Sequence, residues 1–515
     1  MKFLTELRFP QLPKYRNILL LVLFLPLLFI DNRSSHDWGD DFAQYIHQSK
    51  NIVQGIPQSE TGFIYSQENY IGPTAYPVGF PLLLAPVYAV FGNSMLAFTS
   101  LISVFYFLLA FLLYLFYRRK IPEAAAIVLA FVFIYNPQML LFKQEVMSDL
   151  PFTVFLALTF LLYPKMGQKG VAWLIGFGVL CGFLITIRSV GFVLIAAIIA
   201  DGLLNLIRQR RNSRLKWAES AHFRQLVYRP GVVVISAVFF YYLLNSIIFR
   251  IPSGGSLRDY LSFYYSGNFL AAIPANLEHY IEVYRFIYTP VTGPFRALAL
   301  LCGSAFLTMT LIGFLKKACS GLEIFDLFFI FYLLILLVFP NNDSAYRLLI
   351  PVVFLLLYYA ALGFRSVTLL KTVSGAHKAV LLGILMFGLF LPGIIRTAGA
   401  SRTLLDGPQQ KETQQAFEYI QKNLPDSAVI SFVKPRALAL YTGHKGVADP
   451  FTTDVTSTYV QNRQHSADFV LVHSDLTSET VKRYLRVMKD RVSLVWQNKH
   501  FRLYRINPFN PATQN

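Results

Sequence analysis

An acidic cluster, Asp37-Trp38-Gly39-Asp40-Asp41, follows the first apolar segment of the chain. Carboxylates next to a membrane span are costly to desolvate, so their presence there is a sign of function rather than of packing. In a pocket at the membrane surface, such a carboxylate can take a proton from an acceptor group. Asp40 and Asp41 are therefore the first catalytic candidates.

Further polar residues occur where later apolar segments begin or end. Lys143, Glu145 and Asp149 belong to the segment KQEVMSDLPF, Arg188 separates two closely linked apolar segments, and Arg347 begins another. Carboxylates beside cations suit transfer from a phosphate leaving group, because Arg or Lys stabilises the negative charge that leaves. The matching donor is a lipid-linked phosphosugar, whose chain stays in the bilayer while its head group reaches the surface.

Simpler roles for these residues remain open alternatives. Asp40 is a favourable cap for a following helix, and Asp149, two residues before Pro151, is a favourable helix start. Lys143 can extend from a helix end to the wet interface, and Arg188 can anchor a helix end.

A divalent metal is another open alternative, although the sequence points to no certain cofactor. His36 and His47 flank the acidic cluster and offer nitrogen ligands beside its carboxylates. Cys181, Cys302 and Cys319 lie in or at the ends of apolar segments without the spacing of metal ligands or of a disulfide framework.

The composition is that of a membrane protein. Of the 515 residues, 55% are hydrophobic and 14% are charged, whereas a soluble protein carries about 25% charged residues. The formal charge of +18 comes from Lys and Arg clusters between long apolar blocks. That arrangement orients membrane helices, so we exclude nucleic acid as a partner and expect the lipid bilayer instead.

The apolar blocks predict eleven transmembrane helices. The first, from Asn17 to Ile30, is expected to be retained, because no small-residue cleavage pattern follows it. The apolar segment at 79–92 is short and contains two prolines, so we expect it to be re-entrant or interfacial. The predicted spans are 14–30, 94–117, 122–142, 148–164, 171–187, 189–207, 231–249, 294–315, 322–340, 345–364 and 378–397.

An odd number of spans places the two termini on opposite sides of the membrane. Lys and Arg are more frequent in the loops on the N-terminal side, which predicts a cytoplasmic N-terminus. The acidic cluster, Lys143, Arg188 and Arg347 then share the extracytoplasmic face with the C-terminal region. The expected location is the bacterial plasma membrane, with the chain as a multi-pass protein.

The chain divides into a transmembrane domain, residues 1–400, and a soluble domain, residues 408–508. Two outer loops, 31–78 and 250–293, belong to the first domain, and helical spacing of apolar residues after Asp41 predicts an amphipathic helix in the former. The second domain alternates helical and strand patterns, which is typical of a small α/β domain.

Five motifs in a fixed order carry a family resemblance. They are DDFAQYI (Asp40–Ile46), YPVGFPL (Tyr76–Leu82), Asp149-Leu150-Pro151, Thr186-Ile187-Arg188 and the run Arg347–Pro351. This set resembles the GT-C membrane glycosyltransferases, and within them the protein mannosyltransferase and lipid A aminoarabinose transferase superfamily, over roughly residues 10–400. The family often has Glu as the second acid, where this chain has Asp41.

The resemblance implies a helical polytopic fold with about eleven transmembrane helices. It also implies transfer of one hexose or pentose, with inversion, from a polyprenyl-phosphate donor to a protein, lipopolysaccharide or glycolipid acceptor outside the cytoplasm. Which of Asp40 and Asp41 is the base stays open. The implied residues are Asp40, Asp41 and Asp149 as catalytic carboxylates, Arg188, Lys143 and Arg347 at the donor phosphate, and Glu145, Tyr45 and Tyr76 in the pocket.

The main alternative is a transporter or flippase for a lipid or polar solute. Such a protein is expected to have charged residues in the middle of several spans and often an internal repeat, and the sequence has neither. A receptor or scaffold is a weaker alternative, because it gives the acidic cluster no function.

Overall fold

The computed structural model of the chain describes residues 16–30, 32–65, 71–212, 221–251, 269–287, 296–339, 345–366, 404–449 and 454–507, with a few residues between 390 and 397. The chain forms two compact units. The helical unit comprises residues 1–32, 99–247 and 268–402. The sheet unit comprises residues 33–98, 248–267 and 403–515, so the first loop and the C-terminal region fold together.

The helical unit is built from helices. One of them, α4, begins at Met95, four residues before the unit's second stretch of chain. Their bounds are α1 (Arg16–Phe24), α4 (Met95–Arg118), α5 (Glu123–Ile134), α6 (Pro137–Lys143), α7 (Asp149–Leu162), α8 (Val171–Ile187), α9 (Phe192–Asn212), α10 (Ala221–Tyr242), α12 (Ala272–Ile287), α13 (Arg296–Ser320), α14 (Ile324–Val338) and α15 (Ala345–Ser366). A π-helix, Leu243–Ile248, continues α10.

Six of the described helices are long and apolar enough to cross a membrane, and the pair α5 and α6, bent by 62°, makes a possible seventh. The protein is therefore an integral multi-pass membrane protein. A helix lies at each of the first ten predicted spans, but α1, α8 and α14 are shorter than a full span. The predicted total of eleven is not confirmed, and most of the span predicted at 378–397 lies outside the described residues.

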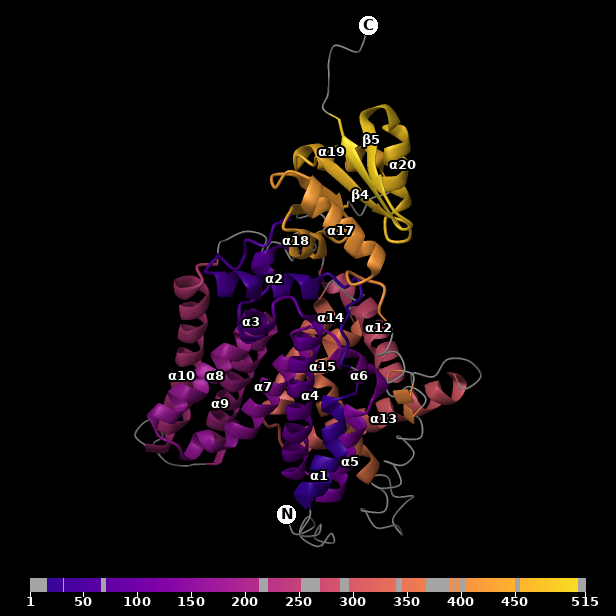
Figure 1. The fold of residues 1–515 in the computed structure, drawn as a ribbon. Helices are drawn as coiled ribbons and strands as arrows, with labels where there is room; N and C mark the ends of the chain where they lie inside the picture. Colours follow the sequence, from indigo (N-terminus) through magenta and orange to yellow (C-terminus); the bar gives the residue numbers. More distant parts are fainter. Residues whose placement is uncertain are drawn as a thin grey trace. The chain divides into compact units, whose positions relative to one another are not determined.

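Glycines allow two helix pairs of the helical unit to pack closely. A Cβ at Gly313 of α13 would lie 1.8 Å from the carbonyl oxygen of Tyr359 in α15, and one at Gly363 would lie 1.9 Å from that of Met309. Gly178 and Gly182 of α8 similarly face the backbone of α10, beside which α8 runs in Figure 1. Small residues at such spacing are the usual means of close helix packing in membranes.

The sheet unit contains helices α2 (Asp41–Gln54), α3 (Gly79–Phe91), α17 (Lys411–Asn423), α18 (Pro435–Thr442), α19 (Val455–Gln464) and α20 (Glu479–Val487). Its strands are β1 (Phe63–Ile64), β2 (Val429–Phe432), β3 (Lys445–Ala448), β4 (Phe469–His473), β5 (Val492–Gln497) and β6 (Phe501–Ile506).

The described strands form one sheet in the order β1-β3-β2-β4-β6-β5. Strands β1 to β4 pair in parallel, whereas β6 pairs antiparallel with both β4 and β5. The predicted alternation of helices and strands in a small C-terminal α/β fold is confirmed. Strand β3 and helix α19 were not predicted, nor was the pairing of β1, from the first loop, with β3.

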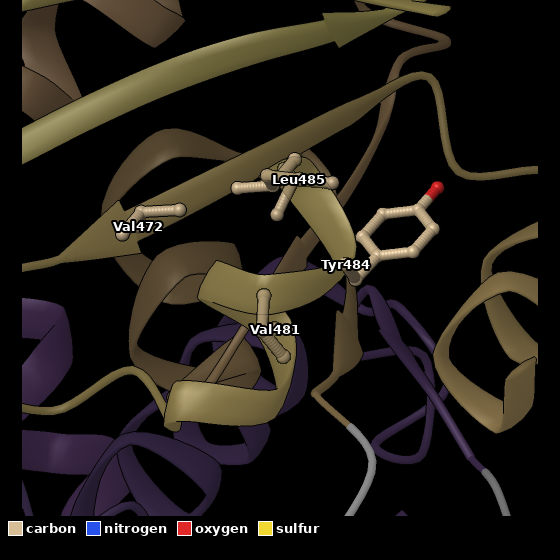
Figure 2. Packing of buried hydrophobic residues seen from close by; sticks show 5 residues of the cluster. Val472, Val481, Tyr484 and Leu485 are labelled. Atoms are coloured by element: carbon tan, nitrogen blue, oxygen red, sulfur yellow. The ribbon is translucent and has the colours of Figure 1, made fainter. Parts of the chain in front are cut away.

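The core of the C-terminal part lies between β4 and α20. Val470 and Val472 alternate along β4 and so point to the same face of the sheet. They meet Val481, Tyr484 and Leu485, whose spacing places them on one side of α20. Figure 2 shows Val472 and the three α20 side chains around this contact. The core gives the end of β4 and the loops beside it a rigid support.

Helix α2 has the amphipathic pattern expected after the acidic cluster. Phe42, Tyr45 and Ile46 are buried, and α2 packs against α3 and α18 of the same unit. The helix ends at Gly55, whose φ of 69° is in the left-handed region that glycine adopts without strain. Its first turn therefore presents Asp40 and Asp41 toward residues of the C-terminal part.

Candidate active site

Asp149 lies at the centre of the first cluster of predicted residues, in the helical unit. It is the first residue of α7, and only 1% of its side chain is exposed. Its Oδ1 accepts a hydrogen bond from Nη1 of Arg188 at 2.5 Å, and its Oδ2 accepts one from Nε of Arg347 at 2.8 Å. We call these three residues the arginine-pair site.

The arginine-pair site brings together the ends of three helices. Asp149 begins α7, Arg188 follows the last residue of α8, and Arg347 lies in the first turn of α15. The two arginine side chains are 15% and 18% exposed, so the cations rather than the carboxylate reach the surface of the cluster. Two guanidinium groups with one carboxylate carry a net positive charge, which suits a phosphate ligand.

Lys143 and Glu145 have different surroundings. Lys143 is fully buried at the end of α6, where its ammonium donates to the carbonyl of Ile30 and to Oδ1 of Asn32, the latter at 3.0 Å. Glu145 lies in the turn between α6 and α7, where its amide donates to the carbonyl of Phe142. Lys143 thus ties α6 to the end of the first apolar segment.

The second cluster lies in the sheet unit, around Asp40 and Asp41. Asp40 is buried and occupies the N-cap position of α2, but its side chain makes no capping hydrogen bond to the first turn of that helix. Instead, its Oδ1 accepts the backbone N–H of Ala437, in the first turn of α18, at 3.1 Å. Its Oδ2 accepts no hydrogen bond from the described residues and lies 3.9 Å from Nε of Arg436.

Asp41 shares Arg436 with Tyr76. Nη1 of Arg436 donates to Oδ1 of Asp41 at 3.0 Å and to the hydroxyl of Tyr76 at 2.6 Å. The Tyr76 hydroxyl in turn donates to the same Oδ1 of Asp41. Tyr45 packs edge-on against Tyr76, with ring centroids 5.2 Å apart. We call Asp40, Asp41, Tyr76 and Arg436 the acid-pair site.

Arg436 is the functional candidate that the sequence analysis missed. The signal available was a cation that follows Lys434 and Pro435 in the first turn of α18. A cation there is disfavoured by the helix dipole unless anions compensate it. The hydrogen-bond partners of its side chain lie 360 to 395 positions away in the sequence, which no local pattern reveals.

Burial dominates the electrostatics of the acid-pair site. It raises the pKa of Asp40, an effect opposed by the positive charges of Arg436 and Lys434 and by the N–H of Ala437, and reinforced by Asp41. Burial also raises the pKa of the Tyr76 phenol well above its ordinary value, so Tyr76 stays a hydrogen-bond donor. A carboxylate with a raised pKa is better suited to accept a proton than an ordinary one.

The metal alternative finds no support in the histidines that flank the acidic cluster. The His36 ring stacks on Phe42, with ring centroids 3.9 Å apart, and its Nδ1 lies 3.1 Å from Oδ1 of Asp37. Among the described residues, the group with the spacing of metal ligands is elsewhere, at His473, Asp475 and His500.

Comparisons with known proteins give a family of similar sequence and several similar folds. The family model described as dolichyl-phosphate-mannose-protein mannosyltransferase matches residues 75–228, a range that includes Tyr76, Asp149 and Arg188. No curated protein matches the sequence. Among solved structures, ArnT from Cupriavidus metallidurans bound to undecaprenyl phosphate is similar over 96% of this chain and 98% of its own, with a TM-score of 0.56 and 12% identity.

The chain has the fold of the GT-C glycosyltransferases. The oligosaccharyltransferase AglB from Archaeoglobus fulgidus, in complex with an inhibitory peptide and a dolichol-phosphate, is similar over 92% of this chain and 71% of its own, with a TM-score of 0.54 and 14% identity. The arabinofuranosyltransferase AftD from Mycobacteria matches 97% of this chain and 40% of its own, with a TM-score of 0.51 and 11% identity. The predicted resemblance to GT-C glycosyltransferases is thus confirmed.

Proposed function

We propose that this GT-C protein transfers a single sugar from a polyprenyl-phosphate donor to an acceptor outside the cytoplasm. The observation that carries the proposal is Asp149, buried between Arg188 and Arg347 at the ends of three apolar helices. A cluster with this excess of positive charge is costly beside a membrane unless it binds an anion.

The donor phosphate is the anion that fits the arginine-pair site. As the bond between the anomeric carbon and the phosphate oxygen breaks, the phosphate gains negative charge, which Arg188 and Arg347 stabilise. Asp149 holds both guanidinium groups in place through its two oxygens. The ArnT structure with undecaprenyl phosphate and the AglB structure with a dolichol-phosphate support a lipid-phosphate ligand for this fold.

Asp40 is our candidate for the general base. Its buried carboxylate has a raised pKa, and its Oδ2 accepts no hydrogen bond from the described residues. In the proposed step, the acceptor group attacks the anomeric carbon, Asp40 takes the proton of that group, the bond to the phosphate oxygen breaks, and the configuration inverts. Protein, lipopolysaccharide and glycolipid acceptors all carry groups that can attack the anomeric carbon and lose a proton.

The proposal includes an orientation. The N-terminus lies in the cytoplasm, and the acid-pair site and the C-terminal strands lie outside it. The support is the excess of Lys and Arg in the loops assigned to the cytoplasm.

Transfer of labelled sugar tests the function directly. Membranes containing the full chain receive polyprenyl-phosphate hexoses and pentoses, and label is followed into protein, lipopolysaccharide and glycolipid. We expect transfer by the wild type and by Arg486→Gln, a control at a well-exposed arginine of α20, and a strong loss in Arg188→Gln. If no donor supports transfer while the membranes move lipid or solute, the transporter alternative replaces the proposal.

A further inference from the structure

Arg436 joins the C-terminal part of the chain to the first loop, which contains the acidic cluster. It lies in the first turn of α18, directly after β2, and contacts Asp41, which precedes it by 395 positions. Only 3% of the Arg436 side chain is exposed. A cation this deeply buried is destabilising unless its charge and its donors are satisfied.

The surroundings of Arg436 fix its orientation. Nη1 donates to Asp41 and Tyr76, and Nη2 donates to the carbonyl of Ile71 at 2.5 Å. The guanidinium carbon lies 5.0 Å from the ring centroid of Phe63 and 4.9 Å from that of Tyr76. Every one of these partners belongs to the first loop, so this loop forms the binding surface for one arginine.

The first turn of α18 makes different contacts with the carboxylates of Asp40 and Asp41. Asp41 is partly exposed, and its Oδ1 receives two donors, the Arg436 guanidinium and the Tyr76 hydroxyl. Asp40 is buried, and among the described residues it accepts a hydrogen bond only from the backbone N–H of Ala437, while its Oδ2 lies 3.9 Å from Nε of Arg436. Two neighbouring acids whose surroundings differ in this way commonly divide their roles between charge stabilisation and proton transfer.

We propose that Arg436 is a positioning residue for the sugar transfer: it holds Asp41 as a fixed counter-ion and orients Asp40 as the proton acceptor. The inference rests on the proposed function and assigns a role to the C-terminal part of the chain, which supplies this arginine and the N–H of Ala437. The carboxylate arrangement is therefore complete only when α18 is docked on α2.

The pH dependence of transfer distinguishes this role from a purely structural one. The charged groups that act on Asp40 are Arg436, Lys434 and Asp41. The Tyr76 phenol acts one step further away, through its hydrogen bond to Asp41. Because Arg436 favours the ionised form of Asp40, its removal leaves Asp40 protonated up to a higher pH. The acidic limb of the kcat/KM profile is then expected to move to higher pH in Arg436→Gln, with a loss of roughly 100-fold near neutral pH.

Matched variants keep the test decisive. Arg436→Lys retains the charge but not the fork that reaches Asp41 and Ile71, so we expect an intermediate loss with a smaller displacement of the acidic limb. Arg486→Gln removes an exposed arginine of α20 and is expected to behave as wild type. Tyr76→Phe removes the hydroxyl that donates to Asp41 and is expected to lower kcat with little change in the KM for the polyprenyl-phosphate sugar.

Folding is measured separately, as the thermal unfolding of the detergent-solubilised full chain. We expect Arg436→Gln and Asp41→Asn to be non-additive in the double variant, because each removes the same contact. Wild-type transfer with an unchanged rate and pH profile in a folded Arg436→Gln would overturn the inference and leave the proposed function intact. A wild type that transfers no sugar overturns the proposed function itself.

Discussion

The arginine-pair site and the acid-pair site are built from the same residue types in opposite proportion. The first has two arginines around one carboxylate, whereas the second has two carboxylates around one arginine. A net positive cluster can hold an anion, and a net negative one can accept a proton or a cation. We infer that charge balance, rather than the presence of carboxylates, indicates which chemistry each cluster supports.

Removal of the proposed base is expected to give the largest effect and would sharpen this contrast most. Asp40→Asn keeps the size of the side chain and an oxygen that can accept the N–H of Ala437, but it cannot take a proton. We expect kcat for sugar transfer to fall by about 10² to 10⁴. Asp41→Asn, which weakens only the counter-ion of Arg436, is expected to lose less.

The comparison of Asp40→Asn with Asp41→Asn in one membrane preparation assigns the base. Equal insertion and thermal stability of the two variants make their rates comparable. A greater loss in Asp41→Asn would transfer the role of base to the more exposed carboxylate and contradict our division of the acid pair.

Loss of either cation of the arginine-pair site is expected to weaken donor binding by a smaller factor. In Arg188→Gln or Arg347→Gln, one charge-assisted contact to the phosphate disappears and Asp149 loses one of its two partners. We expect the KM for the polyprenyl-phosphate sugar to rise roughly 10- to 100-fold. Initial rates at varied donor concentration measure this effect.

The matched lysine variants show whether charge or geometry matters at the arginine-pair site. Arg347→Lys retains the charge but not the planar guanidinium, so an intermediate KM is expected. A normal KM in both glutamine variants, with kcat alone reduced, would mean that the site does not bind the donor phosphate.

The two sites also differ in how far the sequence could predict them. Asp149 and Arg188 lie at helix ends that apolar periodicity located within a few residues, and the ordered motifs placed Arg347 with them. Their clustering follows from helix ends that meet. In the acid-pair site, the motif located Asp40 and Asp41, but Arg436 reaches them only because the first loop and the C-terminal part fold into one unit.

Long-range pairing explains the other omissions in the sequence analysis. Strand β1 has two residues, Phe63 and Ile64, and is defined by its parallel pairing with β3 rather than by any alternation of its own. Strand β3, Lys445–Ala448, contains Gly446, which weakens its strand pattern. A Cβ at Gly446 would lie 2.7 Å from the carbonyl oxygen of Pro435, so the close approach of α18 requires that glycine.

Asp449, directly after β3, offers the smallest but cleanest test. It is buried like Asp40, but its hydrogen bond among the described residues is with the neutral Ser431 hydroxyl, at 3.0 Å. Burial raises its pKa to about 7. The folded state therefore binds a proton that the unfolded state has released, and stability falls as pH rises toward and through 7. Between pH 6 and pH 8 this group alone is expected to cost about 1 kcal/mol of unfolding free energy.

Thermal unfolding of Asp449→Asn, with the exposed Asp426→Asn as control, should lack that loss. If the stabilities of Asp449→Asn and the wild type depend on pH in the same way, burial without a neighbouring cation does not control carboxylate ionisation here. That result would contradict the contrast with Asp40, which has Arg436 beside it.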